Sequence, residues 1–159
     1  MERAPPQLDK VDAEMRNIIE EARVILPGVQ ALFGFQTIAV FNERFDALAI
    51  YAKTCHLTAL AMVIVAVAMV MTPAVYYRTC HGQATPRMAR LSSSMIRGAL
   101  APLALGLALD MFTVFHVVME RLAISVAAGL ATFVLLIGLW FALPARACRR
   151  IATDTDAGR

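Results

Sequence analysis

Charged side chains are scarce in this sequence. Only 17% of its 159 residues are Asp, Glu, Lys or Arg, whereas 59% are hydrophobic, and the mean hydropathy is +0.64. Soluble domains typically have about 25% charged and about 45–50% apolar residues. The composition therefore argues against a water-soluble fold and predicts a protein whose solvent is the bilayer, with membrane lipid as its first partner.

Chemistry-bearing motifs are also missing. The chain has three cysteines, without a CxxC pair or a Cys-His spacing typical of a structural metal, and it has no Gly-rich phosphate loop. Cys80 and Cys148 are expected on the cytoplasmic side and Cys55 on the other, so no disulfide framework is predicted. Cys80 stands next to His81, but no third group is evident to orient such a pair as a nucleophile. We therefore expect no enzymatic activity, no bound metal and no cofactor.

The apolar residues are grouped in blocks near the roughly 20 residues that a helix needs to cross the hydrocarbon. The fold class predicted from them is all-α, a four-transmembrane-helix bundle within residues 24–143. The first block contains Pro27 and two glutamines, and the fourth is expected to stop at Pro144, because proline cannot continue a helical ladder. Only three residues separate the last two blocks, which predicts a tight hairpin. The four predicted spans are residues 24–41, 55–77, 95–119 and 123–143.

Basic residues predict the orientation. Twelve of the 15 Lys and Arg residues lie before the first span, near the second-to-third connection, or in a tail formed by residues 144–159. Cytoplasmic loops of membrane proteins are enriched in Lys and Arg, so both termini are predicted to be cytoplasmic. The sequence pI of about 9.0 therefore reflects topology, and no nucleic-acid partner is expected. Tyr76, Tyr77, Trp140 and Phe141 are expected at the inner membrane boundary.

An amphipathic helix is predicted for residues 1–23, before the first span. Its apolar residues recur every three or four positions, which places them on one side of a helix. This pattern is typical of a helix lying on the inner membrane surface. Its polar face carries five acids, however, and anionic headgroups would repel them. Docking onto protein, either its own cytoplasmic loop or a partner, and a solvated leader without a partner remain as alternatives.

Several short motifs carry a resemblance to a known family. They are Leu26-Pro27-Gly28, the Phe-rich stretch with Phe33, Phe35 and Gln36, the pair Arg44-Phe45, and "TPAVYYR" at residues 72–78. In these motifs the chain resembles an uncharacterised bacterial family of small four-helix membrane proteins, known only as a domain of unknown function. In that family a His is expected where this chain has Tyr77. The resemblance covers the first half by motif and the second by hydropathy. It implies a fold and a bacterial inner membrane, and no activity.

Asp110 lies within the third predicted span. On a helical wheel it shares one face with small residues that include Ala99, Gly106 and Thr113. Such a face lets helices approach closely in lipid, and a polar side chain turns toward the bundle. A protonated Asp110 could be an interhelical tie to Gln30, Gln36 or a backbone carbonyl. Alternatively, it could serve as an ion or proton site, because intramembrane acids are commonly functional.

His116 and Glu120 form a second polar pair near the outer end of that span. They are four residues apart and so lie on one side of a helix. With His56 they could gather at the outer rim and share a hydrogen bond or a metal. A histidine satisfied at a helix interface is the preferred interpretation.

Two functions of different classes follow. The first is a non-catalytic accessory or assembly subunit of a larger respiratory, photosynthetic or transport complex, with other membrane subunits or a second copy of the chain as partners. The second is a small oligomeric ion or proton transporter or channel that uses Asp110. The first is preferred, because catalytic motifs are missing and the polar face of the N-terminal helix suits protein better than lipid.

Overall fold

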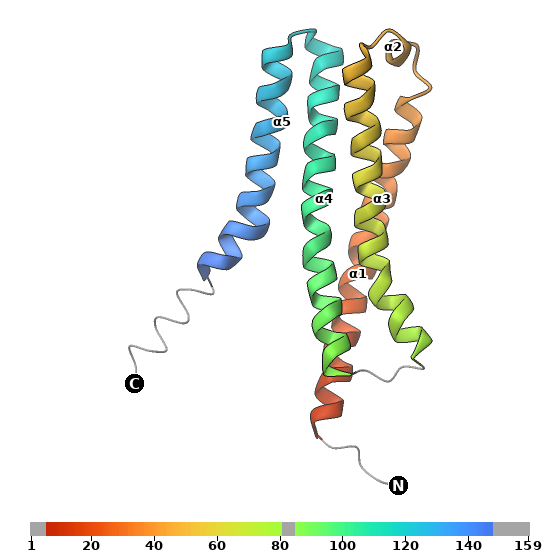
Figure 1. Cartoon of the computed structure of the whole chain (residues 1–159), viewed down its shortest axis with the longest axis vertical. Coiled ribbons are helices and arrows are strands. Elements are labelled where there is room, and N and C mark those ends of the chain that lie inside the picture. The colour runs from red at the N-terminus through yellow and green to blue at the C-terminus, as the bar shows by residue number, and fades with distance from the viewer. Residues whose placement is uncertain (1–5, 81–84, 148–159) are drawn as a thin grey trace. The chain divides into compact units, whose positions relative to one another are not determined.

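The protein is all-α in a computed structural model that describes residues 6–80 and 85–147; of residues 6–9 and Arg44 only the backbone is described. The chain divides into two compact units: unit 1 comprises residues 1–47 and 60–103, and unit 2 comprises residues 48–59 and 104–159. The helices are shown in Figure 1. They are α1 (Pro6–Ala39), α2 (Glu43–Asp46), α3 (Ile50–Thr79), α4 (Pro86–Met119), α5 (Leu122–Ile137) and the π-helical segment η1 (Gly138–Ala142).

Helix α1 is longer than either of the two elements predicted for this region. It runs over 34 residues with Pro27 inside it, so the boundary expected between residues 23 and 24 is no break in the helix. The predicted amphipathic helix and the predicted first span are thus parts of one rod.

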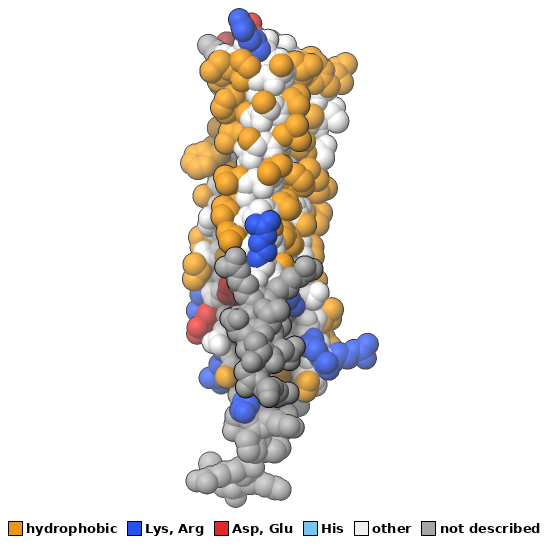
Figure 2. All heavy atoms as spheres, turned by 90° about the vertical axis from the view of Figure 1, so that its left-hand side faces the viewer, with side chains coloured by type: hydrophobic (Ala, Val, Ile, Leu, Met, Phe, Trp, Pro, Cys, Tyr) orange, Lys and Arg blue, Asp and Glu red, His pale blue; other side chains and the backbone are white. Residues whose placement is uncertain are grey.

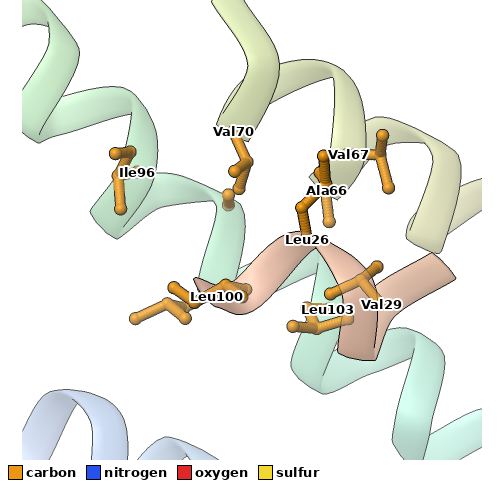
Figure 3. Close-up of a pocket in the computed structure, with 10 residues that line it drawn as sticks. Leu26, Val29, Ala66, Val67, Val70, Ile96, Leu100 and Leu103 are labelled. Atoms are coloured by element: carbon orange, nitrogen blue, oxygen red, sulfur yellow. The ribbon is translucent and has the colours of Figure 1, made fainter. Parts of the chain in front are cut away.

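The apolar side of α1 is buried within unit 1. Met15, Ile18 and Ala22 are 0%, 7% and 6% exposed, and they belong to one core cluster with Val70 of α3 and with Met88, Ala89, Ile96 and Ala99 of α4. Further along the same three helices, Figure 3 shows a small pocket lined by Leu26, Val29, Ala66, Val67, Val70, Ile96, Leu100 and Leu103. The side of α1 expected to lie on lipid is therefore covered by the chain's own α3 and α4.

Helices α3 and α4 both extend beyond the spans predicted for them. Helix α4 begins at Pro86, and the backbone N–H of Met88 donates to the Thr85 hydroxyl at 3.2 Å. Threonine is a favoured N-cap residue and proline a favoured first helical residue. A span beginning at residue 95 would place the helix start at Ser92, Ser93 or Ser94. The hydroxyl that caps α4 is instead that of Thr85. Ser92 lies inside the helix and is 2% exposed.

In unit 2, α4 and α5 approach each other at Gly129. A Cβ atom added there would lie 3.0 Å from the backbone oxygen of Ala108 and 3.1 Å from Cβ of Phe112. Ser125, one turn earlier, is fully buried, and its hydroxyl donates to the backbone oxygen of Arg121 at 2.9 Å. Small side chains thus allow close contact of the two helices, as is common in membrane interiors.

The connection between α4 and α5 is as short as predicted. Glu120 has a φ of +53°, the left-handed conformation that commonly ends a helix. Its N–H donates to the His116 backbone oxygen at 3.1 Å. Arg121 follows in an extended conformation, and α5 starts at Leu122.

The predicted helix end at Pro144 is wrong, because helical structure continues to Ala147. The π-helical segment directly before the proline offers the reason: the N–H of Leu143 donates to the Gly138 oxygen five residues earlier. The wider π-helical turn moves the backbone carbonyl groups that precede Pro144 away from its ring, with which they would clash in a regular α-helix. Pro144 has no N–H group and therefore needs no hydrogen-bond acceptor. The rest of the predicted tail, residues 148–159, lies outside the described residues.

Among the described residues, three helical segments are long and apolar enough to cross a membrane: Ile50–Thr79, Pro86–Met119 and Leu122–Ala147. In the last of these, only 11% of the most apolar stretch is buried within the structure. Figure 2 looks onto α5 and shows many hydrophobic side chains on its surface. Leu130, Val134 and Leu135 of this helix are 59–68% exposed. Such a surface suits hydrocarbon rather than water. The first predicted span, in α1, is not among the three.

Candidate functional site

Asp110 lies in unit 2 beside a histidine of α3. Its Oδ1 is 3.4 Å from Nδ1 of His56, and the two side chains are 15% and 6% exposed. The small-residue face predicted for α4 is buried, with Thr113 at 5% exposure and Ala99 at 2%. Asp110 is thus turned inward from α4, and its carboxyl group lies beside the imidazole of His56.

A second polar pair joins the same two helices. The Tyr51 hydroxyl and Nε2 of His116 share a hydrogen bond of 2.8 Å, whose donor depends on the tautomer of the imidazole. The His116 ring stacks on Phe112, with centroids 5.8 Å apart and planes 4° from parallel. Its other nitrogen, Nδ1, is buried and has no hydrogen-bond partner in the described part of the chain. His116 is therefore held at an interface, on one nitrogen only.

The outer-rim group of His56, His116 and Glu120 does not share one ligand site. His56 pairs with Asp110 and His116 pairs with Tyr51, while Glu120 is exposed in the turn between α4 and α5. Within residues 6–80 and 85–147, no group of three or more His, Cys, Asp and Glu side chains is placed to hold a metal ion.

The two glutamines of α1 belong to unit 1 and differ from each other. Gln36 is buried at 4% exposure, whereas Gln30 is exposed and lines a shallow apolar pocket with Phe33, Ile64 and Val67. Thr37, on the same side of α1 as Phe33, donates its hydroxyl to the Phe33 backbone oxygen at 2.9 Å.

Sequence reasoning missed Tyr51 and the pairing of His56 with Asp110. A usable signal was present, because residues equally far from the middle of an antiparallel hairpin lie level with each other. His56 and Asp110 are each 27 positions from residue 83, and Tyr51 and His116 are 32 and 33 positions from it. Two polar residues at such symmetric positions in apolar spans are candidates for contact.

The Cys80-His81 motif lies partly outside the described residues. Cys80 is half-buried, and His81 is not described.

These features define a class: an all-α protein with three candidate membrane spans in the part of the chain that the structure describes, which indicates a multi-pass membrane protein with polar side chains paired between its helices. Within this class, the chain belongs to the family of unknown function DUF6328, whose family model matches residues 6–144. The resemblance to an uncharacterised family is thereby confirmed, and the match extends it over the second half. No curated protein and no solved structure matches the chain.

Proposed function

We propose that this protein is a non-catalytic accessory or assembly subunit of a larger membrane protein complex. The main observation behind this proposal is the burial of Met15, Ile18 and Ala22 in the core of unit 1. Because the part of α1 up to Arg23 uses its apolar side for its own chain, the side of this part that remains for other molecules is polar and charged.

The exposed face of α1 has mixed charge. Glu14, Glu20 and Glu21 are exposed on it together with Lys10, Arg16 and Arg23. Acidic side chains are repelled by anionic lipid surfaces, whereas a mixed pattern can pair with a complementary protein surface and select among partners. A face of this kind, held on a packed three-helix core, supports docking of a protein partner.

The proposal includes a location and a topology. The chain would sit in a bacterial inner membrane as a bundle of four spans, the fourth contributed by the apolar half of α1 from residue 24 onward. Both termini would be cytoplasmic, in agreement with the distribution of basic residues.

Thiol labelling of intact cells tests this topology. A membrane-impermeant reagent should modify Cys80 only after lysis, whereas Cys55 would be the one described thiol open to the outside. Labelling of Cys80 before lysis would contradict the orientation.

Purification in mild detergent tests the partner. Complexes isolated with the wild-type chain should be lost or weakened when Glu20 and Glu21 are both changed to Lys, because two exposed attractive charges become repulsive. Deletion of residues 1–23 is a poorer test, since it also removes core residues. Glu43→Lys, an exposed acid of α2, is the matched control. Equal recovery of the same partners with the double variant and with the control would refute docking on this face.

A second function, a small oligomeric ion or proton transporter or channel, is favoured by one specific observation: the contact of His56 with Asp110. A carboxylate and an imidazole within a membrane domain can pass a proton between them, and such groups mark proton paths in pumps. Tyr51 and His116 supply a further pair nearer the ends of α3 and α4.

Reconstituted liposomes decide between the two functions. With a pH-sensitive dye inside and a proton or sodium gradient, a transporter predicts flux above that of empty liposomes, abolished in Asp110→Asn because an amide cannot ionise. Glu120→Gln, an exposed acid, should keep the flux. No flux in the wild type, with a folded Asp110→Asn variant, would leave the accessory subunit as the sole proposal.

A further inference from the structure

The stretch between Asp46 and Asp110 contains no acidic residue, but it contains four arginines. Three of them, Arg87, Arg90 and Arg97, are exposed on α4. At 100° per residue, their positions fall within about 80° of one another on the helix. Ser94 and Ala101 are exposed between and beyond them. Helix α4 thus carries a stripe that is basic at its start and becomes uncharged after residue 97.

The packing of unit 1 shows which parts of the neighbouring helices are level with Arg97. A Cβ atom on Gly98 would lie 2.9 Å from Cε of Met69, and Ile96, Val70 and Leu26 line one pocket (Figure 3). Arg23, which is exposed, precedes Leu26 by about one turn. Arginines of α1 and α4 therefore flank the same level of the three-helix core.

Beyond that level all three helices are free of charge for most of a membrane's thickness. Residues 24–42 carry no charged side chain, and residues 98–109 carry none before Asp110. As an α-helix, residues 98–119 are about 33 Å long, which matches the ~30 Å hydrocarbon core. A hydrocarbon boundary placed at Arg97 would pass near Met71 of α3, and the segment with Tyr76 and Tyr77 would project past it.

The arginine side chains are directed along the helix, away from the hydrocarbon. Nε of Arg97 donates to the Ser93 backbone oxygen at 3.2 Å, and Nε of Arg90 donates to the Pro86 oxygen at 3.3 Å. Each side chain therefore runs back toward the start of α4, as basic residues do at a membrane boundary. A guanidinium has four further N–H donors, whose fork geometry fits the oxygens of a phosphate.

We propose that the Arg90–Ser94–Arg97 stripe of α4 is a binding site for the phosphate headgroup of an anionic phospholipid, whose acyl chain lies along the exposed small residue Ala101. The Arg97 guanidinium, which reaches back to Ser93, and the Ser94 hydroxyl supply the hydrogen-bond donors, while Arg90, two turns nearer the start of α4, adds positive charge at the level of the headgroup. Residues 98–109 of α4, which follow the stripe, carry no charged side chain, so a ligand that also has a hydrocarbon chain fits this surface better than a free anion. This site is independent of the partner proposed above.

Native mass spectrometry of the purified full chain in detergent tests the site, with phosphatidylglycerol and phosphatidylcholine as probes. The wild type should bind phosphatidylglycerol more tightly. Removal of each arginine, in Arg90→Gln and Arg97→Gln, should weaken the preference about fivefold, which corresponds to the ~1 kcal/mol of one basic side chain at an anionic surface. The double variant should bind the two lipids alike. Arg16→Gln on α1 and Arg121→Gln beyond α4 are matched controls that should keep the preference.

Three outcomes would overturn the proposal. The first is equal binding of both lipids by the wild type, and the second is an undiminished preference in the double variant. The third is displacement of the lipid by inorganic phosphate at equal concentration, which would make the site one for a free oxyanion. Circular dichroism of the double variant should match that of the wild type, because both side chains are exposed; a loss of helix would count against a surface role of these arginines.

Discussion

The contacts that stabilise unit 1 internally differ in kind from those that stabilise unit 2 internally. In unit 1, large flexible side chains fill the space between three helices, with Met15 and Met88 at 0% and 2% exposure. In unit 2, helices approach through Gly129 and Ser125, and polar pairs join α3 to α4. Unit 1 is thus stabilised mainly by burial of apolar side chains, and unit 2 by the close approach of helix backbones and by polar pairs.

The difference follows from the solvent on each side of a helix. Burial of a Met or Ile is favourable where the alternative is water, which suits the part of unit 1 that carries the charged face of α1. In hydrocarbon, an exposed Leu loses nothing, so helices associate through small residues and polar contacts. Unit 2, with its apolar outer surface, has the interface expected there.

The largest expected effect is in the core of unit 1. Met15→Ala should lower the free energy of unfolding by about 2–5 kcal/mol, because a fully buried side chain leaves a cavity. Thermal unfolding of the purified protein in detergent, followed by circular dichroism, gives the change. The exposed neighbour Asn17 supplies the control, since Asn17→Ala should stay within about 0.5 kcal/mol. If both variants behave alike, α1 lies against lipid and the comparison of the units fails.

The next effect concerns the close approach in unit 2. Gly129→Ala should destabilise the protein by about 1–3 kcal/mol, because the new methyl group meets backbone and the helices must separate. Gly138→Ala in the following segment is the control, because nothing lies within 4 Å of its Cβ position; it should be neutral or slightly stabilising. Resistance to unfolding in mixed micelles measures both. A harmless Gly129→Ala would mean that α5 does not depend on this contact.

The polar pair of unit 2 should contribute less. Asp110→Asn keeps a hydrogen-bonding group of the same size and should change stability by no more than about 1–2 kcal/mol. Asp110→Leu should cost more, because it fills a face of small residues with a branched side chain. A double-mutant cycle with His56→Gln should give a coupling of about 0.6 kcal/mol, and at most about 1.7. Strict additivity of the two substitutions would show that the pair contributes no stability.

The smallest effect is expected in the turn of unit 2. Glu120→Gly should stabilise the protein by about 1 kcal/mol or less, because glycine adopts the positive φ of this position without steric cost. The neighbour Arg121 has φ −119°, so Arg121→Gly should instead destabilise slightly through the unfolded chain. Unfolding midpoints of the two variants should move in opposite directions. Parallel shifts would refute the strain assigned to Glu120.

Much of the fold could be predicted from hydropathy alone. The all-α class, the long apolar helices and the short α4–α5 turn follow from block lengths and from the three residues between blocks. Helix ends were less predictable. Pro144 was expected to end its helix, but the π-helical turn before it is a backbone adjustment that hydropathy does not record. The pair Thr85-Pro86 is a recognisable signal for the start of α4, but a span predicted from residue 95 does not use it.

The candidate site was predictable only in part. The inward position of Asp110 follows from the small residues that share its helical face, since this is a property of one helix. The partner of Asp110 is a property of two helices, and their register decides it. His56 and Tyr51 gain their roles because α3 and α4 pair around a connection centred near residue 83.

The sequence by itself determined that this chain has long helices apolar enough to cross a membrane, and that one of them carries an acid on a face of small residues, because each of these depends on composition or on the period of a single helix. Only the tertiary structure decided that the apolar side of α1 is covered by α3 and α4, and that imidazole side chains meet Asp110 and Tyr51. Amphipathicity reveals that a helix face must be buried, whereas the surface that buries it is selected by packing between segments far apart in the chain.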